Sequence, residues 1–157
     1  WYSKGLLHNG AHFADLLSFW FGLILDLKLV APGRRVGNQD AEPDLRLEFA
    51  QGSALLCAAR EEDYSHYTVE IVAANGRLRY EQGGQIFWQP AIPHAVLSGY
   101  RHLDETSEVI PSDMNRYQHR IAEQLSLALR ACKHSLCTGA QSIACQEWLN
   151  MAISDQT

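Results

Sequence analysis

The sequence lacks an apolar run long enough to cross a lipid bilayer. Its longest apolar stretch, residues 13–30, is interrupted by Asp15, Ser18, Asp26 and Lys28. A membrane-spanning helix needs about 20 predominantly apolar residues. No basic region followed by a cleavable apolar run stands at the N-terminus. These absences predict a protein without a membrane partner.

Clustered basic charge is also missing. The chain of 157 residues has 13 Lys and Arg against 18 Asp and Glu, for a formal net charge of −5. A nucleic-acid-binding surface needs a basic face that neutralises phosphates. Because the basic residues are scattered, the sequence predicts no nucleic-acid partner.

Cysteines are few, and their spacing matches no zinc ribbon or zinc finger. They are Cys57, Cys132, Cys137 and Cys145. Three of them fall in helix-like segments beside apolar residues, which predicts buried free thiols. Free thiols agree with a reducing, cytoplasmic location.

A glycine-rich phosphate loop is absent as well. No strand is followed by a Gly-x-Gly-x-x-Gly turn that opens a helix. The sequence therefore predicts no cofactor-binding residue within this chain.

The periodicity of apolar residues predicts one helix, then strands, then two helices. Helical spacing is seen at Phe13, Leu16, Leu17, Trp20 and Phe21, with the helix beginning near Gly10 and ending at Gly22. Alternation predicts strands near residues 25–29, 45–49, 54–59, 69–71, 77–80 and 86–88, with weaker ones between 95 and 110. Residues 33–43 are predicted to form a loop, and Asn75-Gly76 a tight hairpin.

Two capping signals mark the C-terminal helices. Ser112 or Asp113 is predicted to cap the first of them, and Thr138 with Gln141 forms a capping box for the second. The order of elements predicts an α+β fold, with a largely antiparallel open sheet of about six or more strands and helices packed on one face. Val72, Ala73 and Phe87 leave both sheet faces partly apolar. This pattern favours a homo-oligomer formed through the open sheet face, although a few exposed apolar residues would also explain it.

The segment 4–15 holds the densest group of chemically active side chains. It contains Lys4, His8, Asn9, His12 and Asp15, interspersed with glycines. If a helix begins near its second glycine, His12 and Asp15 share a face that is rotated from the apolar stripe, and His8 lies in the turn before the helix. Polar groups at such a position can hold an anion or polarise a hydroxyl.

This segment resembles the Gfo/Idh/MocA oxidoreductases, a family named for glucose–fructose oxidoreductase, inositol dehydrogenase and a rhizopine catabolism protein. Members carry Asp-x-Gly-x-His-x-x-Asp at the start of a helix that ends in Trp-x-x-Gly. Gly10, His12 and Asp15 match this pattern, and Trp20-Phe21-Gly22 resembles the helix end. Residues 70–78 are similar to the central hairpin of the family.

The resemblance implies a C-terminal substrate and oligomerisation domain over residues 1–157, like that of dihydrodipicolinate reductase or glyceraldehyde-3-phosphate dehydrogenase. An N-terminal Rossmann domain outside this chain would bind NAD or NADP and supply a catalytic lysine. The substrate would be a sugar, a nucleotide sugar or a cyclic polyol. His12 would transfer the proton of the substrate carbinol, for which an imidazole has a suitable pKa near neutrality. Lys4, Asn9 and Asp15 would contact substrate oxygens.

Other interpretations of these residues stay open. His8 replaces the Asp of the family pattern, so it either takes a related catalytic role or indicates a non-catalytic carbohydrate-binding or dimerisation module. His12 alone is also compatible with a capping or buried histidine, and Asp15 with a carboxylate that stabilises the helix start. A metal site of His8, His12 and Asp15 would need a helix that begins before His8, which Gly5 and Gly10 disfavour.

Overall fold

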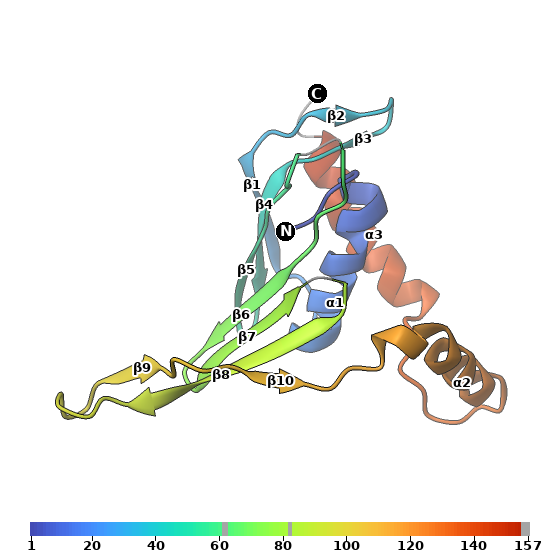
Figure 1. The fold of residues 1–157 in the computed structure, drawn as a ribbon. Helices are drawn as coiled ribbons and strands as arrows, with labels where there is room; N and C mark the ends of the chain where they lie inside the picture. The colour runs from blue at the N-terminus through green and yellow to red at the C-terminus, as the bar shows by residue number, and fades with distance from the viewer. Residues whose placement is uncertain (61–62, 82, 155–157) are drawn as a thin grey trace. The chain divides into compact units, whose positions relative to one another are not determined.

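The computed structural model describes residues 1–60, 63–81 and 83–154 (Figure 1). Their contacts divide the chain into two compact units. The first unit comprises Trp1–His66 and Cys137–Thr157, and the second comprises Tyr67–Leu136. In the described ranges, no helix combines the length and the apolar character that a membrane crossing requires.

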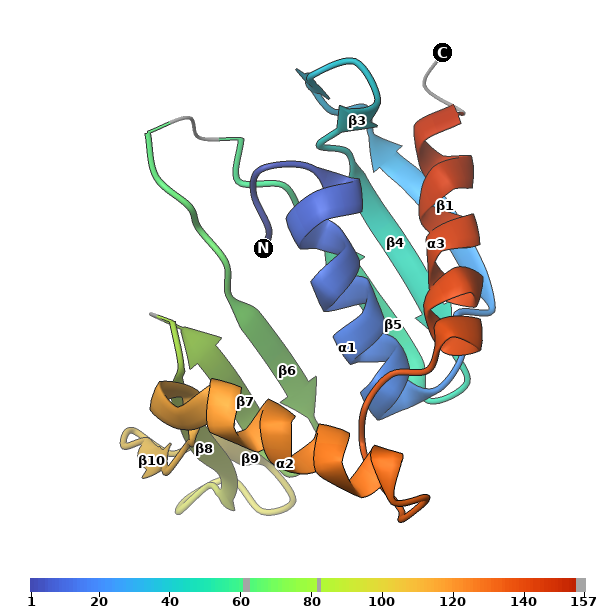
Figure 2. The ribbon, with the colours of Figure 1, turned by 90° about the vertical axis from the view of Figure 1, so that its right-hand side faces the viewer.

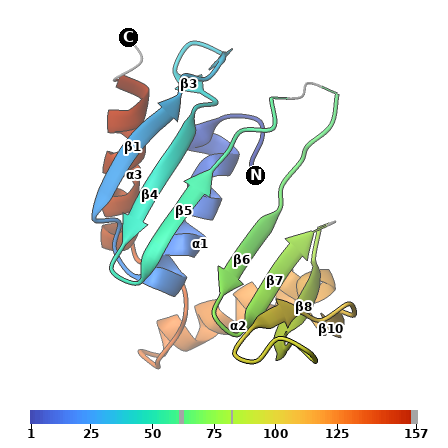
Figure 3. The ribbon, with the colours of Figure 1, turned by 90° about the vertical axis from the view of Figure 1, so that its left-hand side faces the viewer.

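The first unit is a three-stranded antiparallel sheet covered on one face by two helices. Its elements are η1 (Leu6–Gly10), α1 (Ala11–Phe21), β1 (Asp26–Ala31), β2 (Arg35–Val36), β3 (Asp40–Ala41), β4 (Asp44–Phe49), β5 (Gly52–Leu56) and α3 (Gly139–Ser154). The strand order is β1-β4-β5. Figure 2 shows α1 and α3 in front of these strands, and Figure 3 shows the opposite, uncovered face of the same sheet.

The hydrophobic core of the first unit lies between this sheet and the two helices. In β4, the side chains of Leu45, Leu47 and Phe49 are buried whereas Arg46 is exposed, as the alternation in the sequence predicts. Buried residues of both helices complete the core, among them Leu17 of α1 and Leu149 of α3. This packing fixes α1, and with it the segment that carries the candidate site residues.

The segment 33–43 differs from its prediction as a loop. It contains a two-stranded antiparallel ribbon in which β2 pairs with β3, with Arg35 opposite Ala41 and Val36 opposite Asp40. The strands are too short to show an alternating pattern, which explains why the sequence indicated a loop. Gly37 adopts a φ of 65° at the turn between them, where glycine is favoured.

The second unit is a five-stranded antiparallel sheet followed by a helix. Its elements are β6 (Val69–Ala73), β7 (Gly76–Glu81), β8 (Gln85–Pro93), β9 (Arg101–Leu103), β10 (Glu108–Ile110), η2 (Met114–Arg116) and α2 (Tyr117–Leu129). The order is β10-β8-β7-β6, and β9 also pairs with β8. The predicted hairpin is confirmed, but its two-residue turn is Ala74-Asn75, because Gly76 begins β7 and pairs with Ala73.

The α+β class with largely antiparallel strands is confirmed, but two smaller predictions are wrong. Neither Ser112 nor Asp113 caps α2: the Ser112 hydroxyl donates to the Gly84 carbonyl, and the Asp113 carboxylate pairs with Arg120. The cysteines are free thiols, yet only Cys145 is buried, whereas Cys132 and Cys137 are exposed. Both exposed thiols lie outside the regular part of a helix, so no apolar face draws them inward.

Candidate active site

The candidate segment begins with an unusual backbone turn that leads into a π-helical turn ahead of α1. Lys4 and Gly5 have φ values of 65° and 98°, in the left-handed region. The π-helical turn η1 follows at once and continues into α1, and the Gly10 N–H donates to the Gly5 carbonyl at 3.0 Å. The prediction of a helix that begins near Gly10 is confirmed, since α1 starts at Ala11, and His8 and Asn9 lie in the π-helical turn η1 directly before it.

Gly10 is accommodated inside this helical segment because it has no side chain. A Cβ atom there would lie 2.9 Å from Leu6 Cδ1 and 3.1 Å from the ring of Tyr2. Its backbone angles, φ −60° and ψ −35°, are helical. The glycine therefore permits close packing of the turn onto Tyr2, and it does not interrupt the helix.

Three of the five candidate residues line one cleft of about 460 Å³ in the first unit. His8, His12 and Asp15 lie at spacings of four and three residues along the helical segment, and both imidazoles are exposed to solvent. The remaining lining residues are Leu7, Ala11, Cys137, Thr138, Gly139 and Ser142. Lys4 and Asn9 are not among the residues that line this cleft, so their predicted contact with substrate remains a prediction.

The start of α3 supplies the other wall of the cleft. The predicted capping box is confirmed: the Gln141 N–H donates to Thr138 Oγ1 at 3.3 Å, and the Thr138 N–H donates to Gln141 Oε1 at 2.9 Å. This reciprocal pair fixes the first turn of α3 and thereby the position of Ser142. The cleft thus combines imidazole, carboxylate and hydroxyl groups, which can hydrogen-bond a polyhydroxylated molecule.

Asp15 is the acidic group of the cleft, and two thiols are influenced by it. The Cys137 thiol donates to Asp15 Oδ1 at 3.2 Å. Desolvation, and then this hydrogen bond, raise the pKa of Cys137, so that the thiol stays protonated near neutrality. Burial, with a further contribution from the Asp15 charge, raises the pKa of Cys145 to about 11. Neither cysteine is therefore an activated nucleophile.

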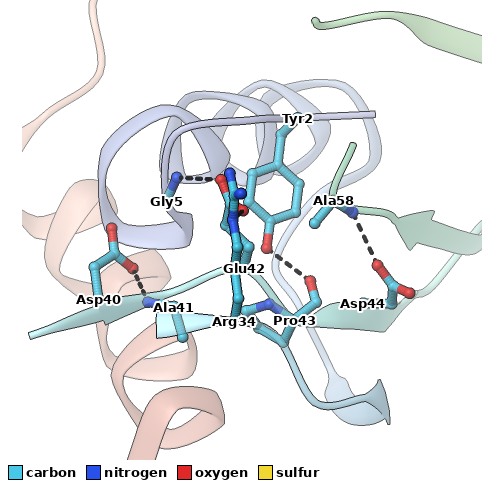
Figure 4. Close-up of polar contacts among 9 residues, drawn as sticks. All are labelled: Tyr2, Gly5, Arg34, Asp40, Ala41, Glu42, Pro43, Asp44 and Ala58. Atoms are coloured by element: carbon cyan, nitrogen blue, oxygen red, sulfur yellow. Dashed lines mark hydrogen bonds and ion pairs between the residues drawn. The ribbon is translucent and has the colours of Figure 1, made fainter. Parts of the chain in front are cut away.

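Two carboxylates that bond to the start of the helical segment, buried Glu42 and half-buried Asp40, were missed by the sequence analysis. Glu42 is fully buried, and its Oε1 accepts the Gly5 N–H at 3.2 Å while Oε2 pairs with Arg34 Nε at 2.6 Å (Figure 4). Both carboxylate oxygens of Asp40 accept the Leu7 N–H, at 3.0 and 3.1 Å. The only signal in the sequence was the pair of acidic residues within a presumed loop, and it carried no spacing that indicates a site.

The described part of the chain does not supply the ligands that the metal interpretation requires. The π-helical turn η1 begins before His8, at Leu6, whereas α1 itself begins only at Ala11. However, within residues 1–60, 63–81 and 83–154 no group of three or more His, Cys, Asp or Glu side chains is placed to hold a metal ion. The spacing of His8, His12 and Asp15 is thus not sufficient to assemble a metal centre.

The described residues also do not fit a dinucleotide site. Such sites form at the carboxyl ends of parallel strands, next to a helix that follows a glycine-rich turn. The ladders of both units are antiparallel. The described ladders therefore do not form a dinucleotide site of this kind.

Comparisons with known proteins show a similarity of fold. No protein-family model and no curated protein matches the chain. Among solved structures, the chain is similar to a crystal structure of a candidate oxidoreductase from Klebsiella pneumoniae, with a TM-score of 0.57 and 11% sequence identity. The match covers 94% of this chain and 46% of that one, so the chain spans about half the length of the protein it resembles. At this identity the likeness shows a shared fold.

Proposed function

We propose that this chain is the substrate-binding, C-terminal domain of an NAD(P)-dependent oxidoreductase of the Gfo/Idh/MocA type that acts on a sugar, a nucleotide sugar or a cyclic polyol. The observation that carries the proposal is the cleft in which His12 lies exposed beside His8 and Asp15. The fold shared with a longer candidate oxidoreductase supports it. So does the match of Gly10, His12 and Asp15 to the motif of the family.

In this proposal His12 is the general base for oxidation of a carbinol. Its imidazole accepts the hydroxyl proton as the carbonyl group forms, and it returns a proton in the reverse direction. A nicotinamide nucleotide, held by a domain outside this chain, would supply the redox chemistry as the hydride acceptor. The exposed position of His12 in the cleft leaves its ring accessible to a substrate hydroxyl.

His8 and Asp15 are proposed to orient the substrate. His8 lies one helical turn before His12 and lines the same cleft, so it can contact a neighbouring hydroxyl or assist the proton transfer. Asp15 already accepts the Cys137 thiol at one oxygen, which leaves its second oxygen for a substrate hydroxyl. The exchange of the family's Asp for His8 then changes which substrate hydroxyls are recognised.

The proposal also includes a cytoplasmic homo-oligomer. Val72 and Val109 lie on one face of the second sheet, and their side chains are 76% and 68% exposed. The same face also carries Glu70, Arg77 and Gln89, so a second copy that packs on it would cover exposed valines within a largely polar face. Free cysteines agree with a reducing compartment.

The experiment that tests the function uses the full-length protein that contains this chain. It is incubated with NAD⁺ or NADP⁺ and a panel of sugars, nucleotide sugars and cyclic polyols, and nucleotide reduction is followed by absorbance. We expect turnover with at least one polyol class. No reduction with any member of the panel, combined with tight binding of a carbohydrate, would support the rival function of a non-catalytic carbohydrate-binding module, which the presence of His8 favours.

A further inference from the structure

We propose that Asp40 and Glu42 are positioning residues that hold the η1 turn so that His8 and His12 face the cleft. Both belong to a segment, residues 40–43, that contacts the start of the candidate helix at three points. The catalytic part of this inference rests on the proposed role of His12. The geometric part does not, because it concerns only the backbone that carries the two imidazoles.

Asp40 makes the contact nearest to the cleft. Its two carboxylate oxygens accept the Leu7 N–H at 3.0 and 3.1 Å, and Oδ1 also accepts the Ala41 N–H at 2.7 Å. Leu7 lines the cleft and directly precedes His8. The N–H groups of a first helical turn have no partner within the helix, and a carboxylate there also interacts favourably with the helix dipole. Asp40 therefore fixes the backbone immediately before the first imidazole.

Glu42 makes the second contact, at the residue where the turn begins. Its buried carboxylate accepts the Gly5 N–H and is itself held by the Arg34 guanidinium at 2.6 Å (Figure 4). A buried carboxylate needs such a partner, and the pair has a defined geometry because Nε points at one oxygen. The backbone around it is equally constrained, since Gly33 leaves no room for a Cβ atom beside the Glu42 carbonyl group.

Pro43 makes the third contact, through Tyr2. The Tyr2 hydroxyl donates to the Pro43 carbonyl at 2.7 Å, and the Tyr2 ring lies against Gly10, two residues before His12. The helical segment is thus held at Gly5, Leu7 and Gly10 by one short stretch of chain. Because an imidazole displaced by about 1 Å can lose about 10²-fold in rate, this anchoring bears directly on proton transfer.

The test compares three variants of the full-length protein. Asp40→Ala removes both acceptors of the Leu7 N–H, and Asp40→Asn restores one of them. Asp44→Ala is the matched control: Asp44 accepts the Ala58 N–H at 2.9 Å and pairs with Arg60 at 2.8 Å, but it does not bond to the helical segment. Each variant is measured for kcat, for KM, for thermal stability, and for the imidazole signals of ¹³C-labelled histidine by NMR.

We expect Asp40→Ala to lower kcat by about 10- to 100-fold, with the KM for the nucleotide unchanged. The solvent deuterium isotope effect on kcat should rise, because proton transfer becomes slower. Asp40→Asn should recover most of the rate. The signals of His8 and His12 should shift or broaden in Asp40→Ala while that of His119, in the second unit, stays in place. Asp44→Ala should leave kcat and these signals unchanged even if it lowers the melting temperature.

Two results would overturn the inference, and they differ from a failure of the proposed function. If the His8 and His12 signals are the same in Asp40→Ala as in the wild type, Asp40 does not position them. If His12→Ala inactivates the enzyme while Asp40→Ala keeps its kcat, the catalytic part is wrong although the function stands. If instead His12→Ala turns over normally, the proposed mechanism fails, and the NMR comparison still decides the geometric part.

Discussion

At the scale of single residues, Gly33 is the position that tolerates a side chain least. A Cβ atom there would lie 2.0 Å from the Glu42 carbonyl carbon and 2.3 Å from the Pro43 nitrogen, both of which belong to the backbone. We expect Gly33→Ala to lower the free energy of unfolding by about 1–3 kcal/mol or more, as measured by urea denaturation. Gly139→Ala is the control, since a Cβ there meets nothing within 4 Å. Equal stability of the two variants would show that the backbone near Glu42 can move.

The buried thiol of Cys145 makes stability depend on alkaline pH. Burial raises its pKa from the ordinary value near 9 to about 11 in the folded protein. Above pH 9 the unfolded chain loses this proton while the folded chain keeps it, so the folded state is destabilised as the pH rises to about 11. Unfolding of the chain, measured from pH 8 to pH 11, should therefore show a decline in stability that is smaller in Cys145→Ala. An identical slope in the variant would contradict the raised pKa.

Residue spacing predicted the part of the candidate site that lies on one helical segment. It did not predict the residues that reach the site from elsewhere in the chain. His8, His12 and Asp15 meet in one cleft because helical periodicity is local and readable along the chain. Asp40 and Glu42 bond to residues 33 and 37 positions away, so their role depends on how the β2–β3 ribbon packs. No local pattern encodes such a contact, and the wall formed by Ser142 was missed for the same reason.

At the scale of elements, the capping box of α3 is the feature with the clearest measurable energy. At the start of the helix, the Thr138 N–H donates to Gln141 Oε1, and the Gln141 N–H donates to Thr138 Oγ1. We expect Thr138→Ala to cost about 1 kcal/mol of stability, measured by thermal or urea unfolding. Ser142→Ala on the same helix should stay within about 0.5 kcal/mol of the wild type. A loss in Ser142→Ala as large as that in Thr138→Ala would contradict the capping role.

Elements were predicted best where a single periodicity extends over several residues. The strand around Leu45, Leu47 and Phe49 is as predicted, and the hairpin at Asn75 is predicted to within one residue of its turn, because alternation and turn chemistry act locally. The start of α1 is as predicted, but the π-helical turn η1 before it was not foreseen, because glycine usually disfavours helical structure whereas Gly10 packs closely on Tyr2. The cap of α2 was wrong because Ser112 and Asp113 bond to other partners.

At the scale of the whole molecule, burial is divided unequally between the two units. Every buried apolar side chain within the described residues belongs to the first unit. In the second unit, the apolar side chains Ile121 and Leu125 of α2 are about half exposed. Backbone amides exchange slowly where the surrounding side chains are buried, so the two units should differ in local stability.

Hydrogen exchange of the 157-residue chain tests this difference. Amides of β4 and α3 should be protected longest, and those of β6, β9 and β10 should exchange faster, because few apolar contacts hold them in the isolated chain. Covering the second sheet in an oligomer of the full-length protein should raise the protection of its amides. Protection that is equal in both units of the isolated chain would contradict the unequal distribution of the core.

The central claim is that the imidazole of His12 transfers a proton to or from the substrate, and turnover of His12→Ala in the full-length protein tests it most directly. The control is His119→Ala, which removes an exposed imidazole that pairs with Glu123 in the second unit. We expect kcat of His12→Ala to fall by about 10²- to 10⁴-fold, while His119→Ala keeps the wild-type rate. A His12→Ala variant with wild-type kcat would contradict the account.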